Sequence, residues 1–240
     1  MSFIISSQEE YDNIPDEFDE RVELFRDYLA TMEDFLAEKL RSIGEQQTAS
    51  IRSVQEAITD GVAQEDDYGA VMTYFQEYSD WVSEFGSNLR RGHFLNLMAL
   101  LLSELKDICE QYQLMKHLSR KLTDIAKGSE LEKIQKYLKS ANVYFPDETK
   151  EWEGILGYYK LRNCLLHSGG SVSHYLSGGE SRSVKFWSEN FLIQLVDHGL
   201  VRLVGTERVI LIQRGLCEEV LDTIHYFVRQ IGTRDGSKDL

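Results

Sequence analysis

The chain has 240 residues, of which 42% are hydrophobic and 28% charged, so it is long enough to bury a core of its own. It has only two prolines, and its longest apolar run (94–102) is interrupted by Asn96. These features argue against a β-sandwich, a disordered linker or a membrane span. The formal net charge of −14 excludes a uniformly basic nucleic-acid-binding protein.

The N-terminal region, 1–90, is predicted to be acidic and helical. Apolar residues recur there every three or four positions in three segments, which predicts helices over 16–43, 46–59 and 71–86. Gly44 and Gly86 are the expected stops of the first and third helices. Four aromatic residues of the third helix are predicted to belong to the core: Tyr74, Phe75, Tyr78 and Trp81.

The region 91–170 is predicted to form the core helices. Its first helix is expected over 94–125 and is apolar on most sides at first, which is typical of a central helix. Ser129 is the expected N-cap of a short helix over 131–138, and the next helix is expected over 149–168. Gly169 and Gly170 follow as a stop.

The region 171–240 is predicted to pack as one compact unit with the core. A serine- and glycine-rich loop is expected first, then a β-hairpin over 200–204 and 208–212, and then a helix over 215–231. The predicted fold class is therefore mainly α: a helical bundle with a small C-terminal β-hairpin and a final helix.

Charge is distributed unevenly between the two halves of the chain. Residues 1–110 carry 24 acidic and 8 basic side chains (net −16), whereas residues 111–240 carry 16 and 18 (net +2). We therefore expect any contact with nucleic acid to come from the C-terminal half. A basic stretch over 116–139 is interpreted either as a solvated helix face or as one wall of a groove for an anionic ligand.

The segment with the clearest chemical signal is the end of the helix over 149–168. Asn163 and His167 are four residues apart and share one helix face, while the long side chain of Arg162 starts about 100° away. Leu161 and Leu165 are placed to anchor a neighbouring side in the core. This arrangement of a fixed apolar side and a polar edge is suited to a rigid reactive site.

The pattern Arg-Asn-x-x-x-His, preceded by Glu151-Trp152-Glu153 and followed by Ser-Gly-Gly, resembles the HEPN superfamily. The resemblance covers about 133–170 and implies an all-helical, metal-independent endoribonuclease that leaves a 2′,3′-cyclic phosphate and needs no cofactor. Many members act in toxin–antitoxin and antiviral systems. Some of those toxins carry a modifiable tyrosine two residues after the histidine, but this chain has Gly169 there, so that form of regulation is not implied.

The resemblance implies a role for each motif residue. His167 is expected to act as general acid or base, Arg162 to hold the scissile phosphate, and Asn163 to orient His167 or the phosphate. In-line cleavage needs both an acid and a base, and one motif supplies a single histidine. We therefore expect a homodimer with two motifs facing a shared groove. Four basic residues are candidate RNA-binding groups: Lys116, Arg120, Lys121 and Lys160.

Alternative functions remain open from the sequence. The chain is also consistent with a catalytically inactive binding or scaffold subunit docked on a basic partner, or with a nucleotide or nucleic-acid sensor that binds phosphate through Arg162 without cleaving. A partner antitoxin or defence complex is possible in either case. The other histidines are interpreted as structural or exposed, and the three widely spaced cysteines fit a reducing, cytoplasmic setting without a metal site.

Overall fold

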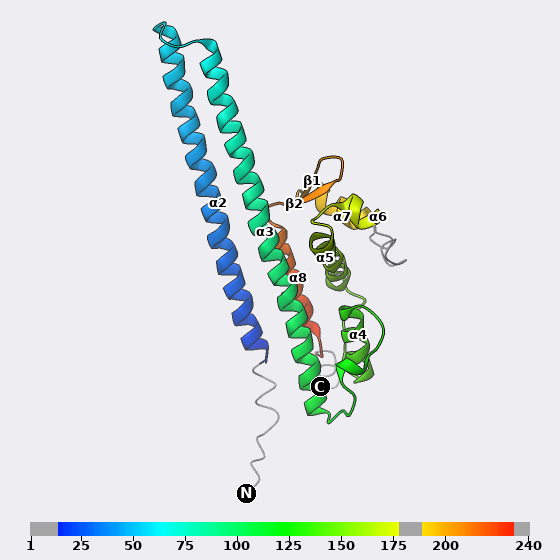
Figure 1. Cartoon of the computed structure of the whole chain (residues 1–240). Helices are drawn as coiled ribbons and strands as arrows, with labels where there is room; N and C mark the ends of the chain where they lie inside the picture. Colours follow the sequence, from blue (N-terminus) through cyan, green and yellow to red (C-terminus); the bar gives the residue numbers. More distant parts are fainter. Residues whose placement is uncertain (1–13, 178–188, 233–240) are drawn as a thin grey trace.

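The computed structural model describes residues 14–177 and 189–232, and its elements confirm the mainly α fold. The longer helices are α2 (Ile14–Thr59), α3 (Glu65–Met115), α4 (Glu130–Ser140), α5 (Lys150–His167) and α8 (Leu216–Gln230). The shorter elements are η1 (Leu122–Asp124), α6 (Val172–Ser177), α7 (Glu189–Asp197), β1 (Val201–Val204) and β2 (Val209–Ile212). Figure 1 shows α8, α5 and α4 along the C-terminal half of α3, with α2 on its other side.

The predicted helices of the N-terminal region are parts of two long helices. Gly44 lies inside the 46-residue α2 and Gly86 inside the 51-residue α3, so neither glycine ends a helix. The two helices run antiparallel and pack along their length, which outweighs the roughly 1 kcal/mol that one glycine costs a helix interior. The boundary expected between the N-terminal region (1–90) and the core helices (91–170) therefore falls inside α3.

The core forms where α3 meets the other helices. It contains Phe18 and Val22 from α2, Leu101 from α3, Leu161 from α5 and Phe227 from α8, all at most 2% exposed. At one end of this core Phe145, Trp152 and Phe227 pack together, with ring centroids 4.9 to 5.4 Å apart. The central position predicted for the apolar helix is thus confirmed.

The α2–α3 hairpin extends beyond this core as an arm, residues 44–85 (Figure 1). Within the arm only Phe75 and Val82 are buried hydrophobic residues among those described, and they form a small cluster with Ile43 at its base. Near the body a bidentate ion pair joins the helices: Arg90 Nε and Nη2 donate to the Glu33 carboxylate at 2.6 and 2.7 Å.

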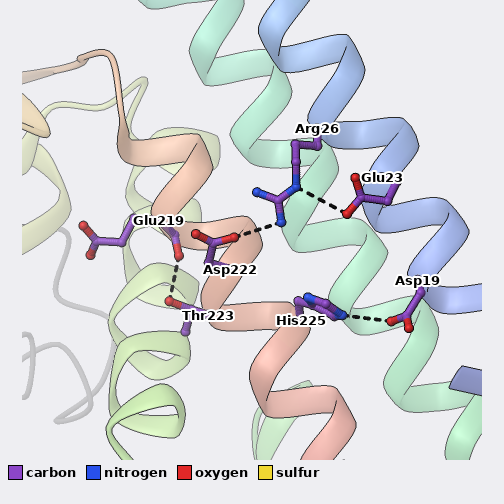
Figure 2. A network of polar contacts seen from close by, with 7 residues as sticks. All are labelled: Asp19, Glu23, Arg26, Glu219, Asp222, Thr223 and His225. Atoms are coloured by element: carbon purple, nitrogen blue, oxygen red, sulfur yellow. Dashed lines mark hydrogen bonds and ion pairs between the residues drawn. The ribbon is translucent and has the colours of Figure 1, made fainter.

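Polar contacts also fasten the start of α2 to α8, as Figure 2 shows. His225 Nε2 lies 2.8 Å from Asp19 Oδ1, and Arg26 Nη2 donates to Asp222 Oδ1 at 3.0 Å. Tyr158 Oη of α5 donates to Glu219 Oε1 at 2.7 Å, so α8 is tied to the motif helix as well. The start of α2 is therefore linked to α8, and through α8 to α5.

Several boundaries differ from the sequence prediction. α3 ends at Met115 rather than near 125, and His117 follows it with a left-handed φ of 48°. Ser129 is confirmed as the N-cap of α4, since its Oγ accepts from Glu132 N at 3.3 Å. The loop expected after Gly170 includes α6, and α7 lies in a segment that received no prediction; part of that expected loop (178–188) lies outside the described residues.

The predicted β-hairpin and final helix are both confirmed. β1 and β2 pair antiparallel, with Val201 opposite Ile212 and Val204 opposite Val209. Ile212 N donates to Ser87 Oγ at 2.9 Å, which fixes the hairpin against α3. Among the helices in the described part of the chain, none combines the length and apolar character that a bilayer crossing requires.

Candidate active site

Helix α5 carries the motif and is oriented by one buried side. Thr149 caps its N-terminus, where Thr149 Oγ1 accepts from Trp152 N at 3.3 Å. Ile155, Leu161 and Leu165 are fully buried on the core side. Because this side is fixed by packing, Asn163 and His167 project away from the core, whereas the half-buried Arg162 starts at the edge of the packed side.

Arg162 and Asn163 are brought into direct contact. Arg162 Nη1 donates to Asn163 Oδ1 at 2.9 Å, and the guanidinium carbon lies 5.7 Å from the ring centroid of Tyr159. Both side chains are partly exposed. A guanidinium held between an amide and an aromatic ring keeps further N–H groups available for an anionic ligand.

His167 is exposed at the last residue of α5. It is five residues beyond Arg162, so the two side chains project about 140° apart around the helix. Within the described residues, Asn163 hydrogen-bonds Arg162 and not His167. One chain therefore presents the guanidinium and the imidazole as two separate groups along an open surface.

Apolar side chains lie between these two groups on the same surface. Leu166 is 47% exposed, and Tyr159 and Leu156 are partly exposed. By helical position Leu166 and Tyr159 project between Arg162 and Asn163, and Leu156 projects between Asn163 and His167. The motif is thus interleaved with apolar surface of the kind that protein interfaces contain.

The C-terminal end of α5 is held by Arg91 of α3. Its guanidinium donates to the carbonyl oxygens of Leu165 and of Gly169, the latter at 3.2 Å. A cation at this position satisfies terminal carbonyls and interacts favourably with the helix dipole. Arg91 was not singled out from the sequence, although Arg90-Arg91 is the one adjacent basic pair in the acidic half.

The β-hairpin holds the backbone that follows His167. Ile210 N donates to Gly170 O at 3.0 Å, and Ser171 forms a bridge with Val209. Gly170 has a φ of +91°, and a Cβ there would lie 3.3 Å from Leu165 Cδ2. The hairpin, to which the sequence assigns no clear role, therefore contributes to fixing the end of the motif helix.

Tyr159, which lies beside Arg162, is also close to the start of α4. Burial raises the pKa of the Tyr159 hydroxyl; the Glu130 carboxylate raises it further, whereas Arg162 lowers it. Glu130 in turn pairs with Lys106 Nζ of α3 at 2.5 Å. Tyr159 therefore lies near both Arg162 and a carboxylate that is paired with a lysine.

Lys160 lines a cavity of about 650 Å³ between α5, α7 and α8. Phe191 and Glu219 also line it, and partial burial lowers the pKa of the Lys160 ammonium. Lys160 and His167 are seven residues apart, so they lie on the same line along the helix. Of the four predicted RNA-binding residues, Lys160 is the one on the motif helix.

The other three predicted RNA-binding residues lie at the far end of α3. Lys116 Nζ donates to Ala141 O at 2.8 Å and to Asn142 O at 3.1 Å, whereas Arg120 and Lys121 are exposed. Arg91, which contacts the end of α5, is 24 residues before Met115, or about 36 Å along the helix. The structure does not bring these three residues together with the motif.

Among the described residues, no cluster of three or more His, Cys, Asp or Glu side chains could hold a metal ion. Cys109, Cys164 and Cys217 are buried thiols. The chain was also compared with protein-family models, curated proteins and solved structures, and none of them matches it.

Proposed function

We propose that the chain is an endoribonuclease of the HEPN class, in which two copies form a composite active site. The observation that carries this proposal is the placement of the motif. Asn163 and His167 project from the solvent side of a helix whose opposite side is buried, and the half-buried Arg162 at the edge of that side contacts Asn163. Their accessibility, and the rigid support from Arg91 and the β-hairpin, are properties that a reactive site requires.

The chemistry assigned to the residues is transfer of the phosphoryl group within RNA. The 2′-oxygen attacks the neighbouring phosphorus and the bond to the 5′-oxygen breaks, which leaves a 2′,3′-cyclic phosphate and a 5′-hydroxyl. His167 of one copy removes the 2′-hydroxyl proton, and the second copy's histidine protonates the leaving oxygen. Arg162, oriented by Asn163, stabilises the negative charge that builds on the phosphoryl oxygens.

Dimerisation is supported by two features of the surface. Arg162 and His167 project about 140° apart around the helix axis, so in a single copy only one of the two side chains can point directly at a ligand. Leu166 and Tyr159 add apolar area between them, which a two-fold contact between identical surfaces can bury.

The test is incubation of labelled RNA with the purified protein in EDTA, followed by analysis of the product ends. We expect cleavage by the parent chain and a loss of about 100-fold or more in His167→Ala and Arg162→Ala, since acid–base and charge-stabilising groups contribute this much. His198→Ala and Arg202→Ala, which change exposed residues of the same types elsewhere, are the matched controls and should cleave normally.

A second arm of this experiment addresses the dimer. Leu166→Glu places a charge in the proposed contact without touching the core, so light scattering should show a monomer that no longer cleaves RNA but keeps its helical circular dichroism. Equal background cleavage from every variant would instead point to a binding or scaffold subunit. Salt-sensitive RNA retention without cleavage would point to a phosphate-binding sensor.

A further inference from the structure

Four aromatic side chains form a continuous exposed row on the arm. Tyr74, Tyr78, Trp81 and Phe85 are 63%, 37%, 57% and 38% exposed, in contrast to the core position predicted for the first three. Their spacing of four, three and four residues places them on one line along α3. We refer to these four residues as the aromatic ladder.

The rings of the aromatic ladder are stacked on one another. Successive ring centroids are 6.4, 6.1 and 5.5 Å apart, and successive ring planes are inclined by 20°, 9° and 8°. Eleven residues of helix separate the first ring from the last, so the apolar strip is about 16 Å long. That length matches three turns of a second helix.

The aromatic ladder is not needed to hold α2 and α3 together. Val71, Phe75 and Val82 form a separate apolar stripe, which packs with Ile43 of α2. The aromatic ladder projects roughly 80° away from this stripe around the helix. Because contiguous exposed apolar surface of this kind is uncommon in monomeric proteins, it indicates an interaction site.

The part of α3 that carries the aromatic ladder has only acidic charged residues. No lysine or arginine occurs between Arg52 and Arg90, while eight acids do: Glu56, Asp60, Glu65, Asp66, Asp67, Glu77, Asp80 and Glu84. Glu77 and Glu84 are seven residues apart and follow one flank of the aromatic ladder. In the described part of the chain no basic side chain pairs with either of them.

We propose that the aromatic ladder binds an amphipathic helix of a partner protein, with apolar residues at i, i+4, i+7 and i+11 and lysine or arginine along one flank. The apolar positions would pack on the rings, while the basic flank would pair with Glu77 and Glu84 and offer cations to the ring faces. This inference is independent of whether the motif on α5 cleaves RNA.

The acidic surroundings of the aromatic ladder favour a basic helix over a second copy of the chain or single-stranded RNA. A second copy of the chain would bring an equally acidic arm against the first, and like charges at an interface are unfavourable. Single-stranded RNA stacks on aromatic rings, but its phosphates would be repelled by the same acids. A basic helix satisfies both the apolar strip and the carboxylates.

The test is selection from a displayed library of 15-residue helical peptides against the full-length protein. The library fixes apolar residues at i, i+4, i+7 and i+11 and allows Lys, Arg, Glu or Gln at the flanking positions. We expect enrichment of Lys and Arg. A selected peptide should bind the Tyr78→Ser/Trp81→Ser variant at least tenfold more weakly than the parent chain. Binding to Glu77→Gln/Glu84→Gln should also weaken, by an amount that shrinks at high salt.

Matched controls are Tyr226→Ser, an exposed tyrosine on α8, and Glu110→Gln, an exposed acid near the end of α3; both should bind like the parent. The proposal is overturned by enrichment of acidic flanks, by the absence of any peptide whose binding depends on the aromatic ladder, or by RNA retention that depends on it. Dimerisation that sedimentation traces to Tyr78 and Trp81 would assign the surface to a second copy instead.

Discussion

His93 is a buried histidine of α3 with an unusual environment. It is 2% exposed, and its ring lies 5.5 Å from Phe25 and 5.2 Å from Tyr28, measured between centroids. Neither ring nitrogen has a hydrogen-bond partner among the described residues. Burial lowers the pKa of His93 from its usual 6.5, because the charged form is poorly solvated there.

This environment predicts a pH dependence of stability. Between the lowered folded-state pKa and 6.5, the unfolded chain binds more protons than the folded chain, so the free energy of unfolding rises with pH. Stability is therefore lost as pH falls below about 6.5, by about 1.4 kcal/mol for each unit of pKa lowering. Urea denaturation at a series of pH values measures this slope.

The control is His93→Leu, which fills the site with an apolar side chain that does not titrate. Its stability should fall less on acidification than that of the parent chain, so the difference between the two curves isolates His93. Parallel curves from pH 5 to 7 would mean that the imidazole is protonated as easily in the folded protein as in the unfolded one.

At the scale of single elements, two glycines in the long helices have different surroundings. A Cβ added to Gly44 of α2 would meet nothing within 4 Å, whereas one added to Gly86 of α3 would lie 3.3 Å from Arg90 Nη1 and 3.4 Å from Leu36. Arg90 is also the partner of the buried Glu33 carboxylate. The two positions thus separate intrinsic helix propensity from packing.

We expect Gly44→Ala to stabilise the protein by about 0.5–1 kcal/mol, because alanine restricts the unfolded chain and favours helix. Gly86→Ala should stabilise the protein less than Gly44→Ala, or destabilise it, because the added methyl group presses on Leu36 and on the ion-paired Arg90. Thermal and urea unfolding of both variants give the comparison. An equal increase in stability at both positions would show that Leu36 and Arg90 can rearrange around the added methyl group at little cost.

The same glycines show why helix boundaries were mispredicted. A glycine that follows a helical pattern of apolar residues favours the end of the helix, which is why the sequence predicts helix ends at Gly44 and Gly86. Local propensity opposes helix there by only about 1 kcal/mol, and pairing of α2 with α3 outweighs it. Ser129 was predicted correctly because its capping box with Glu132 is a local interaction.

At the scale of the whole molecule, burial is concentrated at one end of the hairpin. The arm contains only Phe75 and Val82 as buried hydrophobic residues in its described part, whereas Phe94, Leu97, Leu101 and Leu105 of the same helix are fully buried. Local opening of the arm therefore exposes little apolar surface, and its free-energy cost is correspondingly low.

We expect amide hydrogens of 48–72 to exchange much faster than those of 94–112, although both segments are mostly helical. Hydrogen exchange with mass spectrometry measures both in one experiment. Addition of a peptide selected for the aromatic ladder should slow exchange around 74–85 and leave 94–112 unchanged. Uniformly slow exchange along α3 in the isolated protein would mean that the arm is already covered.

The mainly α class, the β-hairpin and the final helix are all predictable from local patterns, because periodicity, turns and caps are local properties. The same holds for the position of Arg162, Asn163 and His167 at a helix end. Tertiary structure decided the continuity of α2 and α3, the support of α5 by Arg91 and the β-hairpin, and the separation of Lys116 from the motif. It also decided that one apolar stripe of α3 is buried while the aromatic ladder is exposed. These features depend on which distant segments cover each surface, and helical spacing alone cannot distinguish a covered stripe from an open one.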